Sequence, residues 1–188
     1  MKSILKTFTI SLFIFLTGCV QSLHPLYTGQ DLIIDDSLIG TWEDKEANES
    51  WSFSKGAGSG YRLWHTDADG RTGEFIAYLV GVENQLFLDI VPAKPALANT
   101  DLYKGQLLPM HTFARIVKSP GSIEVSVLEM SWLRDVVSEK SVAISHEKVN
   151  GDIVLTSSPK ETQKFLLEHL ATRGAFSEPT RLTRKRRG

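Results

Sequence analysis

Cysteine is scarce in this chain, since Cys19 is the single cysteine among 188 residues. One cysteine cannot form an intramolecular disulfide, and it excludes zinc and iron–sulfur sites that are built from several cysteines. Long apolar runs are missing too. The stretch from Phe8 to Leu16 has nine residues, whereas a helix needs about 20 to cross a membrane. A hydrophobic content of 41% and a charged content of 23% indicate one ordinary globular domain.

Sequence motifs of known catalytic chemistry are also missing. A nucleophile elbow needs a glycine two residues before its serine, but in the glycine-rich segment 56–60 this position, before Ser59, is Ala57. A calcium loop that began at His65 would need a glutamate at its twelfth position, which is Ile76. The turn residues after His65 indicate a hairpin instead. We therefore predict that the protein is not an enzyme.

The remaining candidates for chemistry are the histidines and one carboxylate. The five histidines show no HxH or HExxH spacing, so the sequence predicts neither a metal site nor a cofactor. Asp89 lies in the apolar run 86–91, where an unpaired carboxylate is costly. A structural hydrogen bond or a solvent-facing position is favoured for it over a functional role. An enzyme would need a cleft in which His65, His111 or His146 meets Asp89 or another carboxylate.

Residues 1–18 have the three parts of a secretory signal peptide: basic residues, an apolar stretch, and small residues before a cleavage site. The segment that ends this region resembles the lipobox of bacterial lipoproteins in all four positions, Leu16, Thr17, Gly18 and Cys19. The resemblance implies that lipoprotein processing enzymes attach a diacylglyceryl group to the Cys19 sulfur, cleave before Cys19 and acylate the new amino group. Several acyl chains hold a protein firmly, so the implied partner is a membrane, bound through the lipid on Cys19.

The residues after the cysteine bear on location. In lipoproteins of two-membrane bacteria, an aspartate directly after the cysteine resembles an inner-membrane retention signal, and this chain has Val20 there. The resemblance therefore favours the cell envelope, at the outer membrane facing the periplasm, and export excludes nucleic acid as a partner. Residues 19–36 show no helical or strand period and predict a lipidated tether. The alternative is that Leu23, Leu26 and Tyr27 dock on the domain surface.

Charge is distributed unevenly along the chain. Loss of the signal peptide would reduce the 21 basic residues to 19, against 22 acidic ones. Five basic residues lie among the last eight: Arg181, Arg184, Lys185, Arg186 and Arg187. We predict a basic tail at 184–188, which either is a solvated terminus, the favoured reading, or meets anionic head groups.

The body of the chain, residues 37–183, predicts a single β-rich domain, because short runs of aromatic and β-branched residues recur between turn residues. Turn sequences at 69–70, 83–84 and 120–121 predict consecutive hairpins. A short helix is expected near 132–139, and a C-terminal helix follows the capping box at 158–161. The candidate strands are 39–44, 50–54, 61–66, 73–82, 85–91, 110–118, 122–130 and 152–157, with 180–183 as a closing strand. The predicted fold is mainly β, an antiparallel up-and-down barrel or a strongly bent sheet with two helices.

The start of the first strand resembles a known family. Gly40 and Trp42, separated by one residue, resemble the Gly-x-Trp signature that opens a lipocalin barrel. The resemblance implies a lipocalin-like fold in which Gly40 lets the chain bend closely and Trp42 plugs one barrel end. Arg181 is the candidate for the arginine that stacks on this tryptophan. A core aromatic on an amphipathic strand would give the same pattern.

The layout of the whole chain resembles that of small uncharacterised bacterial lipoproteins, which share the lipobox and the segments 24–28, 38–42 and 86–89. This resemblance implies no activity. Two hypotheses follow. In the first, the barrel binds a small apolar or lipidic ligand against residues such as Phe75, Ala77, Leu79, Leu86 and Leu88. In the second, it is a structural or interaction lipoprotein of the envelope with a packed core, whose partner is an envelope protein. The volume inside the barrel discriminates between them.

Overall fold

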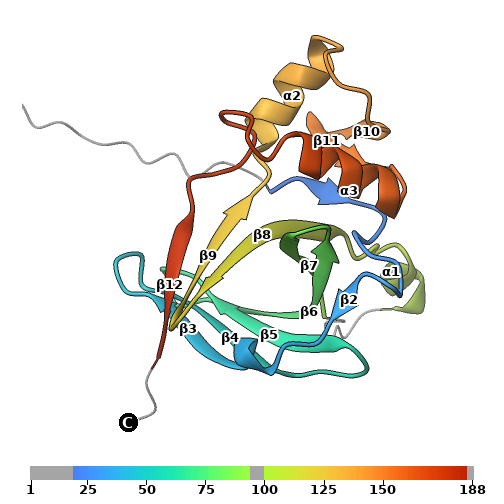
Figure 1. The fold of residues 1–188 in the computed structure, drawn as a ribbon. Helices are drawn as coiled ribbons and strands as arrows, with labels where there is room; N and C mark the ends of the chain where they lie inside the picture. Colours follow the sequence, from blue (N-terminus) through green and yellow to red (C-terminus); the bar gives the residue numbers. More distant parts are fainter. Residues whose placement is uncertain (1–18, 94–99, 186–188) are drawn as a thin grey trace, which may run out of the picture.

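The computed structural model describes residues 19–93 and 100–185, so the predicted signal peptide and the first three lipobox residues lie outside the described part. Its centre is a closed antiparallel barrel of eight strands (Figure 1). Seven strands pair in sequence order, and the eighth, β12, pairs with both β9 and β3 and so closes the barrel. The strands are β3 (Gly40–Asp44), β4 (Glu49–Lys55), β5 (Gly60–Thr66), β6 (Thr72–Val82), β7 (Gln85–Pro92), β8 (His111–Ser119), β9 (Ser122–Val127) and β12 (Thr180–Arg184). The predicted lipocalin-like barrel is confirmed.

Local sequence explains most of this barrel. Along β9, Ile123 and Val125 face the interior, as strand alternation predicts. The three predicted turns join β5 to β6, β6 to β7 and β8 to β9. Gly70 and Gly121 have φ of 78° and 77°, a backbone conformation that glycine adopts without steric cost.

The segment predicted as the eighth strand does not belong to the barrel. Residues 152–155 form β11 (Asp152–Leu155), which pairs with β10 (His146–Val149) and, in parallel, with β1 (Gln21–Ser22). Ile153, Val154 and Leu155 are all buried. A strand that is apolar on both faces carries no signal for its pairing partner. The predicted closing strand at 180–183 fills the eighth place instead.

The described residues contain three α-helices, one more than predicted. α2 (Met130–Ser138) and α3 (Pro159–Glu168) lie where helices were expected, and the capping box between Ser158 and Glu161 is present. α1 (Asp101–Gly105) lies in the connection from β7 to β8, which was predicted as a loop. A 3-10 turn, η1 (Asp36–Leu38), precedes β3.

A second layer covers one side of the barrel. α2, α3, β10 and β11 lie together above it in Figure 1, with β1 beneath them. A hydrophobic cluster fills the space between the layers and joins Phe87 and Phe113 on the outer barrel face to Leu133 and Leu166 on the helices. The barrel interior forms a separate hydrophobic cluster.

Residues 20–33, for which the sequence suggested a tether, instead lie against the domain. Val20 and Leu26 are buried, the Leu26 N–H donates to Asp89 Oδ2 at 2.6 Å, and Gln163 Nε2 donates to the Leu26 carbonyl at 2.7 Å. Tyr27 packs on the cluster between the layers, and β2 (Leu32–Ile33) pairs with β6. The docked alternative therefore describes this segment, because its apolar residues gain more from burial than a free linker would.

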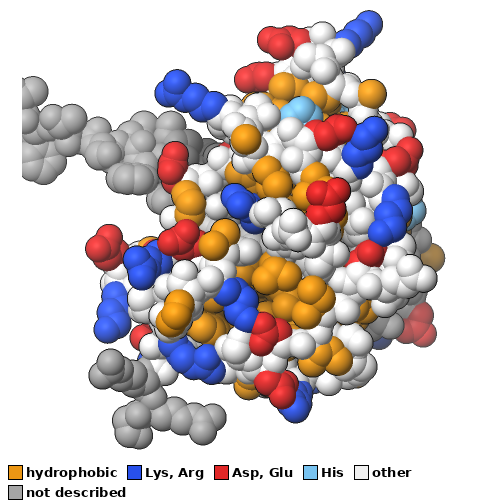
Figure 2. All heavy atoms as spheres, viewed as in Figure 1, with side chains coloured by type: hydrophobic (Ala, Val, Ile, Leu, Met, Phe, Trp, Pro, Cys, Tyr) orange, Lys and Arg blue, Asp and Glu red, His pale blue; other side chains and the backbone are white. Residues whose placement is uncertain are grey.

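The first residues of the predicted basic tail, 184 and 185, belong to the domain. Arg184 belongs to β12. The Lys185 N–H donates to the Thr41 carbonyl at 2.9 Å, and Lys185 Nζ pairs with Glu43 at 2.5 Å. Basic and acidic side chains are interspersed over the molecular face in Figure 2. Residues 186–188 lie outside the described part.

Candidate ligand-binding site

The two ends of the barrel differ in how they are filled. We call the end where β3 begins and β12 finishes the closed end, and the end where β7 finishes and β8 begins the open end. All five residues predicted to face the interior belong to the interior cluster: Phe75, Ala77, Leu79, Leu86 and Leu88. Leu38, Trp42 and Leu182 extend that cluster at the closed end and are buried. The barrel is therefore packed at one end.

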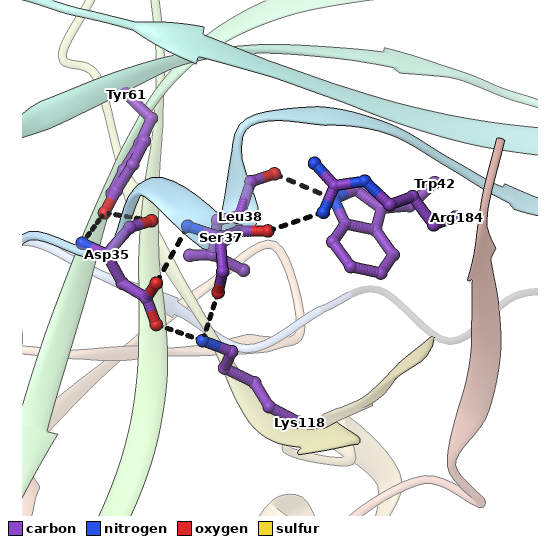
Figure 3. Close-up of polar contacts among 7 residues, drawn as sticks. All are labelled: Asp35, Ser37, Leu38, Trp42, Tyr61, Lys118 and Arg184. Carbon is purple, nitrogen blue, oxygen red and sulfur yellow. Dashed lines mark hydrogen bonds and ion pairs between the residues drawn. The ribbon is translucent and has the colours of Figure 1, made fainter. Parts of the chain in front are cut away.

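Trp42 plugs the closed end (Figure 3). Its indole Nε1 donates to the Leu38 carbonyl at 2.8 Å, and the Arg184 guanidinium lies 4.9 Å from the centroid of its ring. Gly40 has φ of 134°, and a Cβ at this position would lie 2.9 Å from Arg184 Nη2. Gly40 thus makes room for the arginine that covers the tryptophan.

The stacking arginine is Arg184, and the prediction of Arg181 is wrong. Leu182 of β12 faces the interior, and side chains alternate along a strand, so Arg184 shares its side while Arg181 points outward. Arg184 also donates to the Ser37 and Ile39 carbonyls. Arg181 contacts Ser122 at 3.4 Å.

A polar cluster fixes the 3-10 turn to the closed end. The Asp35 carboxylate accepts hydrogen bonds from Lys118 Nζ and from the Ser37 N–H, and the Asp35 N–H donates to Tyr61 Oη at 2.6 Å (Figure 3). The Lys118 side chain, followed by Ser37, lowers the pKa of Asp35 from its usual value of 3.8 to about 2. The negative charge is thus stabilised where the turn crosses the barrel end.

The open end holds a cavity of about 440 Å³. Its walls are mostly apolar and come from six barrel strands, β4 to β9: Trp51, Leu63, Phe75, Ile90, Ala114 and Val127. Its rim is formed by Cys19, Pro92, Leu108 and Met110. The volume lies within the range of about 300–1,000 Å³ that is typical of small-molecule sites. The arrangement can accept an apolar group from the open end only.

A few polar groups stand among these apolar walls. His65 Nε2 lies 3.8 Å from Glu49 Oε2, and its ring meets the Trp51 ring edge-on at 5.4 Å. Gln21 and Thr112 also line the cavity. A small number of polar groups beside apolar walls can orient a ligand that has one polar end.

Cys19, the predicted lipid attachment residue, lies on the rim of this cavity. Its backbone forms an isolated antiparallel bridge with Glu129, and part of its side chain is exposed. Burial, together with the negative charge of Glu129, raises the pKa of the thiol. No local sequence pattern indicates that Cys19 and the barrel mouth lie together.

Two of the three candidate histidines lie near a carboxylate: His65 near Glu49, and His111 near Asp89. His111 Nδ1 lies 2.6 Å from Asp89 Oδ1. Asp89 is buried, and its other oxygen accepts the Leu26 N–H, so the pair holds the N-terminal segment in place, as the structural hypothesis for Asp89 predicted. His146 bonds to the carbonyl of Ile144. Over residues 19–93 and 100–185, no group of three or more histidine, cysteine or acidic residues could hold a metal ion.

The sequence has no match among known family models, curated proteins or solved structures. In the part of the chain that the structure describes, every helix is too short or too polar to span a membrane.

Proposed function

We propose that the protein is a membrane-anchored lipoprotein of the cell envelope that binds a small apolar or lipidic ligand in the open end of its barrel. The observation that carries the proposal is the apolar cavity of about 440 Å³ at that end. Cavities of this kind and size bind small molecules because they remove apolar ligand surface from water. Trp42 and its neighbours pack the other end, so the ligand enters and leaves by the mouth.

The cavity walls favour a ligand with an apolar body and one polar end. Leu63, Phe75 and Ile90 offer no polar side-chain atom to a ligand, so these walls suit its apolar part. His65 and Gln21 lie at the mouth end of the strands and are placed to meet a hydroxyl, carboxylate or phosphate. A fatty acid or a single-chain lipid has this shape.

The lipid anchor rests on the lipobox resemblance and on the position of Cys19, whose side chain is partly exposed at the domain surface. Substitution Cys19→Ser removes the sulfur that would form the thioether. We expect the variant to leave the membrane fraction of its own cells and to lose incorporation of labelled palmitate. Incorporation equal to that of the wild type would contradict the anchor.

Ligand binding is tested with a fluorescent apolar probe such as N-phenyl-1-naphthylamine, displaced by fatty acids or lysophospholipids. Val127→Phe adds a ring that projects into the cavity opposite the small side chain of Ala114. We expect it to weaken probe binding about tenfold or more, which corresponds to about 1.4 kcal/mol.

The matched control is Val117→Phe on β8, where the same substitution falls on an exposed position outside the cavity. It should leave probe binding unchanged. Equal binding by wild type and Val127→Phe would contradict the cavity as the site. Absence of binding by the wild type would favour the alternative, an envelope interaction protein, which the packed closed end suits.

A further inference from the structure

Cys19 is both the proposed site of the lipid anchor and part of the rim of the cavity. The anchor therefore constrains how the barrel is oriented on the membrane. We infer that the open end of the barrel rests directly on the bilayer, with α1 and residues 107–108 in contact with the membrane interface. The inference rests on the proposed lipid at Cys19. It adds an interaction surface and its partner, a lipid bilayer, to the proposed function.

The first step is that no free linker follows the anchor. Val20 is buried, and Gln21 pairs with Thr112 of β8 and with Val154 of β11. Cys19 itself bridges to Glu129. A lipid on its sulfur therefore emerges from a fixed point on the domain surface, in contrast to lipoproteins in which a flexible linker separates the domain from the bilayer.

The site at which the lipid leaves the domain is at the mouth of the barrel. Cys19 lies on the rim of the cavity together with Leu108 and Met110. Acyl chains attached to the Cys19 sulfur enter the hydrocarbon layer within the length of the glyceryl group. The rim must then lie at the membrane surface, because Cys19 and β1 are held to the barrel by pairing with Glu129 and with β8.

The third step is an independent surface feature on the same rim. The connection from β7 to β8 carries four exposed large apolar side chains within seven residues: Leu102, Tyr103, Leu107 and Leu108. Leu102 is 78% exposed and Leu108 is 68% exposed. Leucine and tyrosine side chains are favoured at the boundary between head groups and acyl chains. A connection that is exposed and apolar in water gains free energy there.

The charged residues that the structure describes at the open end do not form a basic patch that would bind anionic lipids, so the contact with the membrane is expected to be apolar. Two of the loops at this end carry both signs in paired form, with Arg71 beside Asp67 and Asp69, and Lys104 beside Asp101. Arg184 and Lys185 lie at the other end, since Arg184 covers Trp42 at the closed end and the Lys185 N–H donates to the Thr41 carbonyl. A zwitterionic bilayer is therefore a sufficient partner, and high salt should not release the surface.

The orientation changes the route of the ligand. An apolar molecule passes between the bilayer and a cavity that opens on it without crossing water, where the exposure of each methylene group would cost about 0.8 kcal/mol. The ligand class that fits this route is a single-chain lipid or fatty acid drawn from the anchoring membrane.

The experiment places an environment-sensitive fluorophore at either end of the full-length, lipidated protein in phosphatidylcholine vesicles. Leu108→Cys carries it at the mouth, and Ile34→Cys carries it beside the closed end as a matched control, since Ile34 is 66% exposed. The acylated Cys19 sulfur does not react, so each variant has one free thiol. We expect a blue shift and quenching by nitroxide-labelled lipids for the probe at 108, and neither for the probe at 34.

Different results would contradict the orientation of the barrel and the lipid anchor. Equal water exposure of both probes on a protein acylated at Cys19 would overturn the orientation and leave the proposed anchor intact. Labelling of Cys19 in the otherwise unsubstituted protein, seen by mass spectrometry of its peptides, would overturn the anchor instead.

Discussion

The closed and open ends belong to one barrel and share its strands, yet one end is packed with side chains and the other encloses a cavity. At the closed end, Trp42 and Arg184 fill the space, and Asp35 and Lys118 fix the turn that crosses it. At the open end, strands of the same sheet enclose a cavity, and Leu108 and Met110 line its rim. The packed closed end offsets the cost of the open end, because a cavity that the protein's own side chains do not fill costs packing energy.

The largest expected effect comes from the plug. Trp42→Ala removes a buried indole with its hydrogen bond to Leu38 and its contact with Arg184, and should lower the free energy of unfolding by about 3–5 kcal/mol. Urea unfolding followed by circular dichroism measures it. Trp51→Ala, on the cavity wall of the neighbouring strand, is the matched control and should cost clearly less. Equal losses of unfolding free energy in the two variants would contradict the distinction between a packed closed end and an open end with a cavity.

The next prediction compares two valines on one strand. Val125 is buried in the packed core, and Val127 lies two residues further on the same face and lines the cavity. Val125→Phe should overpack the interior and destabilise the protein by about 1–3 kcal/mol. Val127→Phe should change the unfolding free energy by less than about 0.5 kcal/mol because space is present. The reverse order, measured by the same unfolding assay, would contradict the assigned positions of packed and open volume.

Acid should weaken the closed end. Lys118 and Ser37 lower the pKa of Asp35 to about 2, so its stabilising effect is complete above its usual value of 3.8 and is lost as pH falls through 2. We expect about 1 kcal/mol from this group after allowance for solvent screening. Asp35→Asn should flatten the pH dependence of unfolding between pH 4 and 2. Some acid sensitivity should remain, since hydrogen bonds from Lys160 and Thr28 outweigh burial and hold the pKa of Asp31 below its usual value.

A loss similar in size to that from Asp35 is expected at the arginine over the plug. Arg184→Lys keeps the charge but loses the planar guanidinium that stacks on Trp42 and donates to two carbonyls. We expect a loss of about 1 kcal/mol in the free energy of unfolding. Arg181→Lys, three residues earlier and outward-facing, should be neutral and serves as the control. A larger loss at position 181 would restore the arginine that the sequence suggested.

The barrel was predictable because its information is local. Strand alternation at Ile123 and Val125, the turns at 69–70 and 120–121, and the capping box at Ser158 each act over a few residues. The position of Gly40 and Trp42 at the barrel start was also readable, since their spacing is contained in three residues.

The open end was not predictable, because it depends on contacts between distant segments. Cys19 and Leu108 meet at one rim, and Asp89 pairs with His111 across 22 positions. Which of Arg181 and Arg184 faces Trp42 depends on which side of β12 faces the barrel interior. That is set by the pairing of β12 with β9 and β3, which are distant in sequence. A cavity is a volume left by side chains of several strands, and no single segment encodes it.

Native mass spectrometry of the protein purified from its own membrane, beside the Val127→Phe variant, tests the central claim most directly. We expect a chain that starts at an acylated Cys19 and carries a small lipidic companion, and a variant that is acylated but carries none. An acylated wild-type chain without a companion, or a companion that Val127→Phe retains unchanged, would contradict a ligand in the open end of the barrel.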